Sequence, residues 1–171
     1  MYQETENRKQ IFPRPYSVVH SQRGLTLIEI LLALAIVGIV SAVGMSALSN
    51  ANKNQALTLE SEKVLSLLSR ARSETLAAKD SSAFGVHFET SKAVLFKGPT
   101  YGAGASGNDI QALSDLVTIS SISLSGGTSD VVFQKLTGAA SASGTIRLSL
   151  LSNASASTTI TIAPTGAAYN N

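Results

Sequence analysis

The residues of this chain whose types and spacing could do chemistry lie in one short stretch, GLTLIE at residues 24–29. Glu29 is the single charged residue between positions 25 and 48. A helix over that run would reach roughly 36 Å at about 1.5 Å per residue, and the hydrocarbon core of a bilayer is roughly 30 Å thick. A carboxylate inside such a run is costly in lipid and is usually functional. The pattern therefore predicts a transmembrane helix over residues 25–48 and makes Glu29 the first candidate functional residue.

Helix capping is a second interpretation of Glu29. Thr26 and Glu29 have the spacing of a capping box, in which each side chain bonds a free backbone N–H at the start of a helix. An acid in the first turn also interacts favourably with the positive end of the helix dipole. Capping leaves Arg23-Gly24 and the long apolar run unexplained, and the two roles are compatible.

The same stretch resembles the class III leader of type IV pilins and type II secretion pseudopilins. The shared pattern is a basic residue, Gly, an apolar residue, Thr, two aliphatic residues and Glu, followed by an uninterrupted apolar run. The resemblance implies that a prepilin peptidase cuts between Gly24 and Leu25 and methylates the new N-terminus at Leu25. Glu29 would then be the fifth residue of the mature chain. The family usually begins its mature chain with Phe, so Leu25 departs from the pattern.

Residues 1–24 form a polar, proline-containing segment that we exclude from the predicted fold as a removable leader. The positive-inside rule places this basic segment in the cytoplasm and the chain after residue 48 outside. Its removal takes Lys and Arg from 13 to 9 and Asp and Glu from 11 to 9, so the mature side chains are neutral overall. The alkaline character therefore belongs to the leader and does not indicate a nucleic-acid-binding surface.

A Sec-type signal peptide is the main alternative for this region. Such a signal has an apolar core of about 7–15 residues followed by a small-residue cleavage site. The small residues at positions 43–47 would fit the cleavage site, but the apolar run before them is longer than that core.

Composition bounds the remaining chemistry. The 171 residues allow one modest domain beside an anchor. The absence of cysteine excludes disulfides and thiolate metal sites. It also excludes the C-terminal disulfide loop of many major pilins, which points away from that branch of the family.

Residues 49–80 show a helical period after the apolar run ends. No Pro or Gly interrupts residues 45–79, so this amphipathic segment and the apolar run form one continuous spine helix, or two helices joined at the Asn-rich residues 50–55. A transmembrane helix with an unrelated amphipathic linker helix is the alternative. Charged residues, Glu60 among them, fall mostly off the stripe. The apolar stripe comprises Leu57, Ser61, Val64, Leu68, Ala71, Thr75 and Ala78, widened by Leu65 and Leu76.

Residues 81–171 change to a period of two, which predicts a β-rich head. The expected strands cover residues 84–88, 92–97, 116–124, 130–136, 144–151 and 158–163, with a hairpin turn at 89–91. Within the third strand, Val117 and Ile119 are expected on one face and Ile122 and Leu124 on the other. The Ser120-Ser121 step between them predicts a bulge or bend.

This order of elements predicts an α+β fold, in which the C-terminal half of a long N-terminal hydrophobic spine helix packs on an antiparallel β-sheet head. The chain also resembles the H-type minor pseudopilins and FimT-like minor pilins. The segments that carry this resemblance are ARSETLAAK at residues 71–79, AFGVHFE at 83–89, and the closing TIRLSL and TTITIAPTGAAY.

Four other motifs are open to a second interpretation. The glycines of residues 102–107 fit GxGxxG, but the segment that follows is too short for the helix of a dinucleotide site, so a surface loop is expected. His87 is a lone strand histidine, for which a satisfied or exposed side chain is expected rather than a ligand. Asp109 and Asp115 could ligate calcium, as in some pseudopilins, although no dense run of oxygen ligands surrounds them. Residues 153–155 spell a glycosylation sequon that a Ser- and Ala-rich turn explains equally well.

DNA capture is a property of some FimT-like minor pilins, where a basic motif near the C-terminus does the work. Phosphate contact requires such bases, and this chain has no Lys or Arg after Arg147. Nucleic acid is therefore not expected as a partner, although Lys92, Lys97, Lys135 and Arg147 could still gather on one face.

The sequence as a whole predicts a minor pilin or pseudopilin, a structural subunit with no enzymatic activity, no cofactor and no metal. The resemblance implies a precursor in the inner membrane with its head outside. Its implied partners are the prepilin peptidase, other pilin or pseudopilin subunits and the inner-membrane assembly platform. A DNA-binding minor pilin and a single-span membrane-anchored β-rich domain are the alternatives. The choice between secretion, pilus and competence systems stays open.

Overall fold

The structure is a computed structural model that describes residues 24–171, apart from the side chains of residues 43–50. Of the expected leader, only Gly24 lies within the described residues. The chain divides into two compact units, Met1–Ser41 and Ala42–Asn171, and each is described by itself.

One α-helix, α1 (Leu27–Leu76), is assigned without a break across residues 50–55, where the sequence allowed one helix or two. It ends earlier than residue 80 because Ala78 takes a left-handed conformation with φ of 50°, followed by a short 3-10 turn at Lys79–Ser81. Thr75 Oγ1 accepts a hydrogen bond of 2.8 Å from the Phe84 N–H, which turns the chain directly from the helix into the first strand. The predicted stripe residues Leu76 and Ala78 are consequently exposed.

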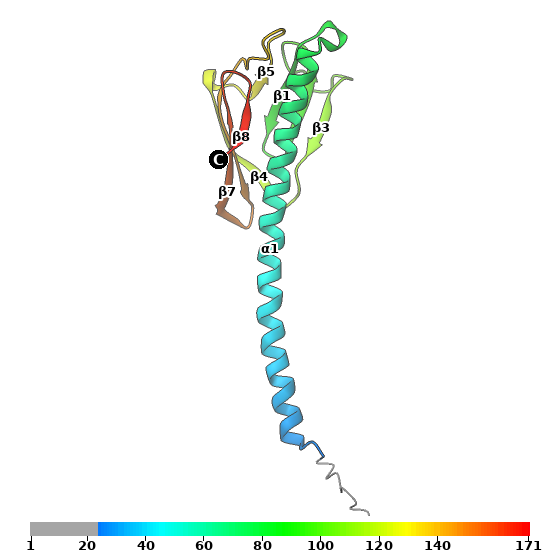
Figure 1. The fold of residues 1–171 in the computed structure, drawn as a ribbon, viewed down its shortest axis with the longest axis vertical. Helices are drawn as coiled ribbons and strands as arrows, with labels where there is room; N and C mark the ends of the chain where they lie inside the picture. Colours follow the sequence, from blue (N-terminus) through cyan, green and yellow to red (C-terminus); the bar gives the residue numbers. More distant parts are fainter. Residues whose placement is uncertain (1–23) are drawn as a thin grey trace, which may run out of the picture. The chain divides into compact units, whose positions relative to one another are not determined.

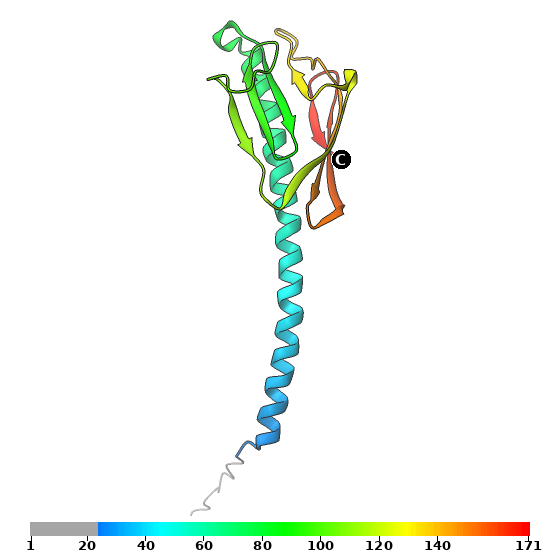
Figure 2. The same cartoon turned by 180° about the vertical axis from the view of Figure 1, so that it is seen from behind.

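The β-rich region forms two four-stranded antiparallel sheets rather than the single sheet expected. Sheet A contains, in spatial order, β3 (Asp109–Ala112), β2 (Lys92–Lys97), β1 (Phe84–Glu89) and β5 (Asp130–Val132). Sheet B contains, in spatial order, β4 (Val117–Leu124), β6 (Gly144–Leu150), β7 (Asn153–Ile162) and β8 (Ala168–Asn170). Within residues 42–171, Figures 1 and 2 show the two sheets beside the C-terminal part of α1. The α+β class is thus confirmed and is compatible with a pilin-like fold.

The strand predictions were right for strands with a clear period of two and wrong where that period was absent. β1, β2, β4 and β6 lie within a residue of their expected bounds, and the turn at residues 90–91 joins β1 to β2 as a hairpin. β5 is shorter than expected because the chain turns after it, with Leu136 at a positive φ of 71°. β7 begins at Asn153 rather than at residue 158, and the short strands β3 and β8 were not expected.

The predicted bulge in β4 is present, but its consequence for the side chains differs from the expectation. Ile119 pairs with Leu148 and Ile122 pairs with Ile146, with the register shift between Ile119 and Ser121. Directly paired residues share a face, and Leu148 and Ile146 are two residues apart on one strand. The extra residue of the bulge therefore returns Ile122 to the core face, where it packs against the buried cluster.

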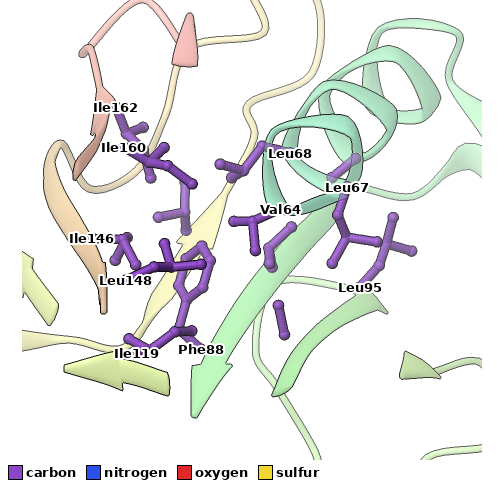
Figure 3. Close-up of a cluster of buried hydrophobic side chains, with 14 of the residues drawn as sticks. Val64, Leu67, Leu68, Phe88, Leu95, Ile119, Ile146, Leu148, Ile160 and Ile162 are labelled. Atoms are coloured by element: carbon purple, nitrogen blue, oxygen red, sulfur yellow. The ribbon is translucent and has the colours of Figure 1, made fainter. Parts of the chain in front are cut away.

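The core is formed jointly by α1 and both sheets (Figure 3). Val64 and Leu68 of α1 are buried with Phe88 of sheet A and Ile160 of sheet B. Figure 3 shows side chains from these elements meeting in one cluster. Glu60, expected off the buried stripe, is only 3% exposed. Its Oε1 accepts a hydrogen bond of 2.7 Å from Lys63 Nζ. The buried acid is therefore paired with a lysine whose side chain remains 47% exposed.

Candidate functional site

The residues singled out by their chemistry lie at the N-terminal start of α1. Gly24, Leu25 and Thr26 precede the helix in a non-helical segment, and Leu27 is the first helical residue. Gly24 and Leu25 are both exposed, and a Cβ placed on Gly24 would meet no atom within 4 Å. The peptide bond between them is therefore an accessible one, as proteolysis requires.

Thr26 occupies the position immediately before the helix. Its Oγ1 accepts a hydrogen bond from the Glu29 N–H at 3.3 Å, and its carbonyl oxygen accepts from the Glu29 and Ile30 N–H groups at 3.1 and 3.2 Å. This arrangement satisfies a backbone donor that the first turn of a helix otherwise leaves free. The reciprocal bond of a capping box, from the Glu29 carboxylate to the Thr26 N–H, is absent among the described residues.

The Glu29 side chain is exposed, and within the described residues its carboxylate makes no hydrogen bond or ion pair. Its neighbours along the helix are large apolar side chains that are also exposed, for example Leu27 at 76% and Ile28 at 71%. Exposed apolar surface of this extent marks a surface that meets another protein or a membrane. Among the described residues, the carboxylate thus has no partner on this apolar surface and is available to a cationic group from another molecule.

The predicted transmembrane run includes residues whose side chains the structure does not describe. Within the described residues, no helix combines the length and the hydropathy needed to cross a membrane. The side chains of residues 43–48, which complete the predicted run, lie outside the described residues.

Asp109, a calcium candidate, serves as an ion-pair partner. Its Oδ2 lies 2.5 Å from Arg70 Nη1, and Arg70 Nε in turn lies 3.0 Å from Glu74 Oε1. Lys79 Nζ lies 3.0 Å from the same Glu74 oxygen. Asp115 is exposed, and among the described residues no group of three or more His, Cys, Asp or Glu side chains could hold a metal ion.

The ion pairs at the end of α1 shift two pKa values. Burial raises the pKa of the Glu74 carboxyl, but the hydrogen bonds from Lys79 and Arg70 outweigh burial, and the net pKa lies below its ordinary value. The pKa of the Arg70 guanidinium is raised, chiefly by its hydrogen bond to Asp109 and then by the one to Glu74. Of these pairs, the one between Arg70 and Asp109 links α1 to β3.

The glycine-rich motif and the dispersed bases do not form the sites that their sequence could suggest. Residues 102–107 lead into β3, which pairs antiparallel with β2, so the parallel unit of a dinucleotide site is missing here. Lys92 and Lys97 are paired with Glu89 and Asp80, at 3.2 and 3.0 Å. Lys135 Nζ donates to the Ser81 carbonyl oxygen, and Arg147 Nε of β6 donates to Ser157 Oγ of the neighbouring strand β7 in sheet B.

His87 is surrounded by two acids and an aromatic ring, which the sequence did not indicate. Its Nδ1 is hydrogen-bonded to Asp130 Oδ1, and its Nε2 lies 3.6 Å from Glu89 Oε1. Its ring stacks on that of Tyr101. Sequence reasoning found no acid arranged around His87, although Glu89 at i+2 shares its strand face. Asp130 could be found only from the pairing of β1 with β5.

Comparison with known proteins gives one finding, and it falls on the start of α1. Residues 19–45 match the family model described as the prokaryotic N-terminal methylation motif. The match supports a prepilin-type leader and the type IV pilin-like class, with processing by a prepilin peptidase and assembly with other pilins. Comparisons with curated proteins and with solved structures gave no match.

Proposed function

We propose that this chain is a minor pilin or pseudopilin of the H-type, a structural subunit that is not an enzyme and that enters a type IV pilus or a type II secretion pseudopilus. The methylation motif at residues 19–45 carries this proposal. The H-type assignment rests on the sequence pattern of residues 71–89 and of the closing strands. The α+β head with two antiparallel sheets is compatible with it.

Processing is the first step of the proposed function. The prepilin peptidase cuts between Gly24 and Leu25 and methylates the new amino group of Leu25. The exposed, non-helical backbone at this bond favours entry into a peptidase site. Before the cut, residues 25–48 hold the precursor in the inner membrane, with the head outside. The sequence supports this anchor because Glu29 is the only charged residue in the run.

Assembly is the second step, and Glu29 is the residue proposed to direct it. A carboxylate in lipid is costly, and an ion pair with good geometry recovers part of that cost. The carboxylate of Glu29, on the apolar surface of α1, would pair with the N-terminal ammonium of a neighbouring subunit. Helix-to-helix contacts would replace lipid contacts around the pair, and the pair would fix the axial register between subunits.

The first experiment is the intact mass and N-terminal sequence of the protein extracted from the membranes of its own host. A chain that begins at methylated Leu25 supports the proposal. A chain that keeps residues 1–24 in a host with an active prepilin peptidase overturns it, and would favour a single-span membrane anchor instead.

The second experiment separates assembly from processing. Glu29→Ala should leave membrane insertion and cleavage intact but reduce incorporation into filaments at least about tenfold, because one buried charge without its partner costs several kcal/mol. Glu62→Ala is the matched control, since Glu62 is an exposed acid of the same helix. Equal incorporation of the two variants would refute the pairing role of Glu29.

A further inference from the structure

The face of sheet A that points away from the core carries its own cluster of side chains. Ala93 and Leu95 of β2 belong to the core cluster, so Val94 and Phe96 point to the opposite face. Val94 pairs with His87, and His87 pairs with Asp130, which places all three on this outer face. Val94 and Phe96 are nevertheless buried, at 0% and 1% exposure.

Residues 98–108 link β2 to β3 and are called the strap here. The strap contains no charged residue and has four glycines, of which Gly98 and Gly104 have positive φ values of 113° and 81°. Its Tyr101 ring stacks on His87 with a centroid distance of 3.9 Å and an interplanar angle of 6°. The same ring meets Phe96 edge-on at 5.6 Å. Tyr101 therefore joins the strap to the outer face.

The His87 ring lies between two carboxylates, whose negative charges attract a protonated imidazole. Asp130 of β5 bonds its Nδ1, and Glu89 of β1 faces its Nε2 at 3.6 Å. Lys92 of β2 lies 3.2 Å from the Glu89 carboxylate and offsets part of that charge. Tyr101 of the strap covers the ring face. The His87 side chain is 19% exposed, so protons can reach it.

We infer that His87 is a pH-operated latch, which holds the strap closed over the outer face of sheet A when it is protonated and loosens the strap when it is neutral. The inference is independent of the assembly role of Glu29 and concerns what the head exposes.

The sign of the effect follows from the contacts. Neutral His87 can donate from Nδ1 to Asp130, but it then turns an unshared electron pair at Nε2 toward the Glu89 carboxylate. Protonated His87 donates from both nitrogens and carries a positive charge between the two acids. It also presents a cation to the face of the Tyr101 ring, an attraction that the neutral ring lacks. The contact with the Tyr101 ring favours the closed strap at lower pH, and the two carboxylates hold the charged His87 ring in place against it.

Loosening of the strap has a defined consequence for the surface. Tyr101 would move away from Phe96, and the Phe96 ring, which lies over Gly85, would become exposed. A Cβ on Gly85 would come within 2.6 Å of the Phe96 ring, which shows how closely that ring covers the strand. The latch thus controls the exposure of an apolar patch on the outer face across the pH range in which histidines change charge, about pH 5 to 8.

Hydrogen exchange of the mature chain in detergent tests the latch. His87 is the only histidine after residue 24, so a response of the folded head between pH 5.5 and pH 8 can be assigned to it. After correction for intrinsic exchange rates, amides of the strap should exchange about threefold to tenfold more slowly at pH 5.5 than at pH 8. Amides of β6 and β7 serve as the internal control. Equal corrected rates at both pH values would overturn the inference.

Variants separate the latch from a structural role. His87→Gln replaces the imidazole by an amide that can still donate a hydrogen bond but cannot be protonated in this pH range, so the pH dependence of strap exchange should disappear. Tyr101→Leu should give fast strap exchange at both pH values, whereas Tyr169→Leu, at a tyrosine 52% exposed on β8, should behave as the wild type. A pH response that survives His87→Gln refutes the inference.

A measurement on the unaltered chain covers the case in which His87→Gln does not fold. The NMR resonances of the His87 and Tyr101 rings should shift with one common midpoint as the pH is changed. Tyr101 resonances that stay constant while His87 titrates would refute the latch.

Discussion

The substitution Leu68→Ala tests how the helix is fastened to the head. Leu68 of α1 is 1% exposed in the core cluster, together with Val64, Ile160 and Ile162. Leu59 lies on the same helix at 49% exposure and provides a matched control. Because the same side chain is changed to alanine on the same helix, the difference in helix propensity cancels between the two variants.

The expected cost is worked from the surroundings of Leu68. Truncation of a buried leucine to alanine costs about 2–5 kcal/mol, and the cost is larger where the site cannot collapse around the cavity. The core cluster that contains Leu68 also contains residues of both hydrogen-bonded sheets, which limits such collapse. We therefore expect a loss of about 3–4 kcal/mol in the free energy of unfolding of the head for Leu68→Ala. Leu59→Ala should cost less than about 1 kcal/mol.

Urea unfolding of the purified mature chain in detergent, followed by the near-ultraviolet circular dichroism of Tyr101 and Tyr169 in the head, measures both values. With an m-value of about 2 kcal/mol/M, the midpoint for Leu68→Ala should fall by about 1.5–2 M. Similar midpoints for Leu68→Ala and Leu59→Ala would refute the packing of α1 through this stripe. A change in the m-value instead of the midpoint would indicate that the substitution altered the compactness of the head.

Two further predictions concern the backbone and the charges of the head. Gly144→Ala should destabilise the head by more than about 2 kcal/mol in the same urea assay, because Gly144 has a φ of 151° and a Cβ there would lie 2.0 Å from the Ser123 carbonyl oxygen. Gly107→Ala is its control, since a Cβ there meets nothing within 4 Å, and equal midpoints would refute the argument. Because the pKa of the Glu74 carboxyl is lowered, the ionised carboxylate stabilises the head at pH values above 4.5, the ordinary pKa of this group. This contribution is lost as the pH falls through the pKa of the folded state. Thermal unfolding from pH 7 to pH 3 should therefore show a smaller acid-induced loss in Glu74→Gln than in the wild type, and an identical loss would contradict the assignment.

The sequence alone was sufficient for features that depend on neighbours along the chain. The candidate site from Gly24 to Glu29 is contiguous, so its residue types and spacing are visible without a fold, and the family-model match at residues 19–45 falls on it. The period of two predicted β1, β2, β4 and β6, and the Ser120-Ser121 step predicted the bulge in β4. Each of these features is set by local conformational preference.

Only the tertiary structure decided the features that depend on strand pairing and on packing between distant segments. The division into two sheets and the short strands β3 and β8 follow from pairing partners, because strands of three or four residues carry too little pattern of their own. The burial of Glu60 depends on where the sheets meet α1. The latch around His87 joins residues 43 positions apart in the chain, His87 and Asp130, and their meeting is determined by the register of β1 against β5. A period in the sequence specifies which face of an element is apolar, but the pairing of elements specifies which polar groups meet on the opposite face.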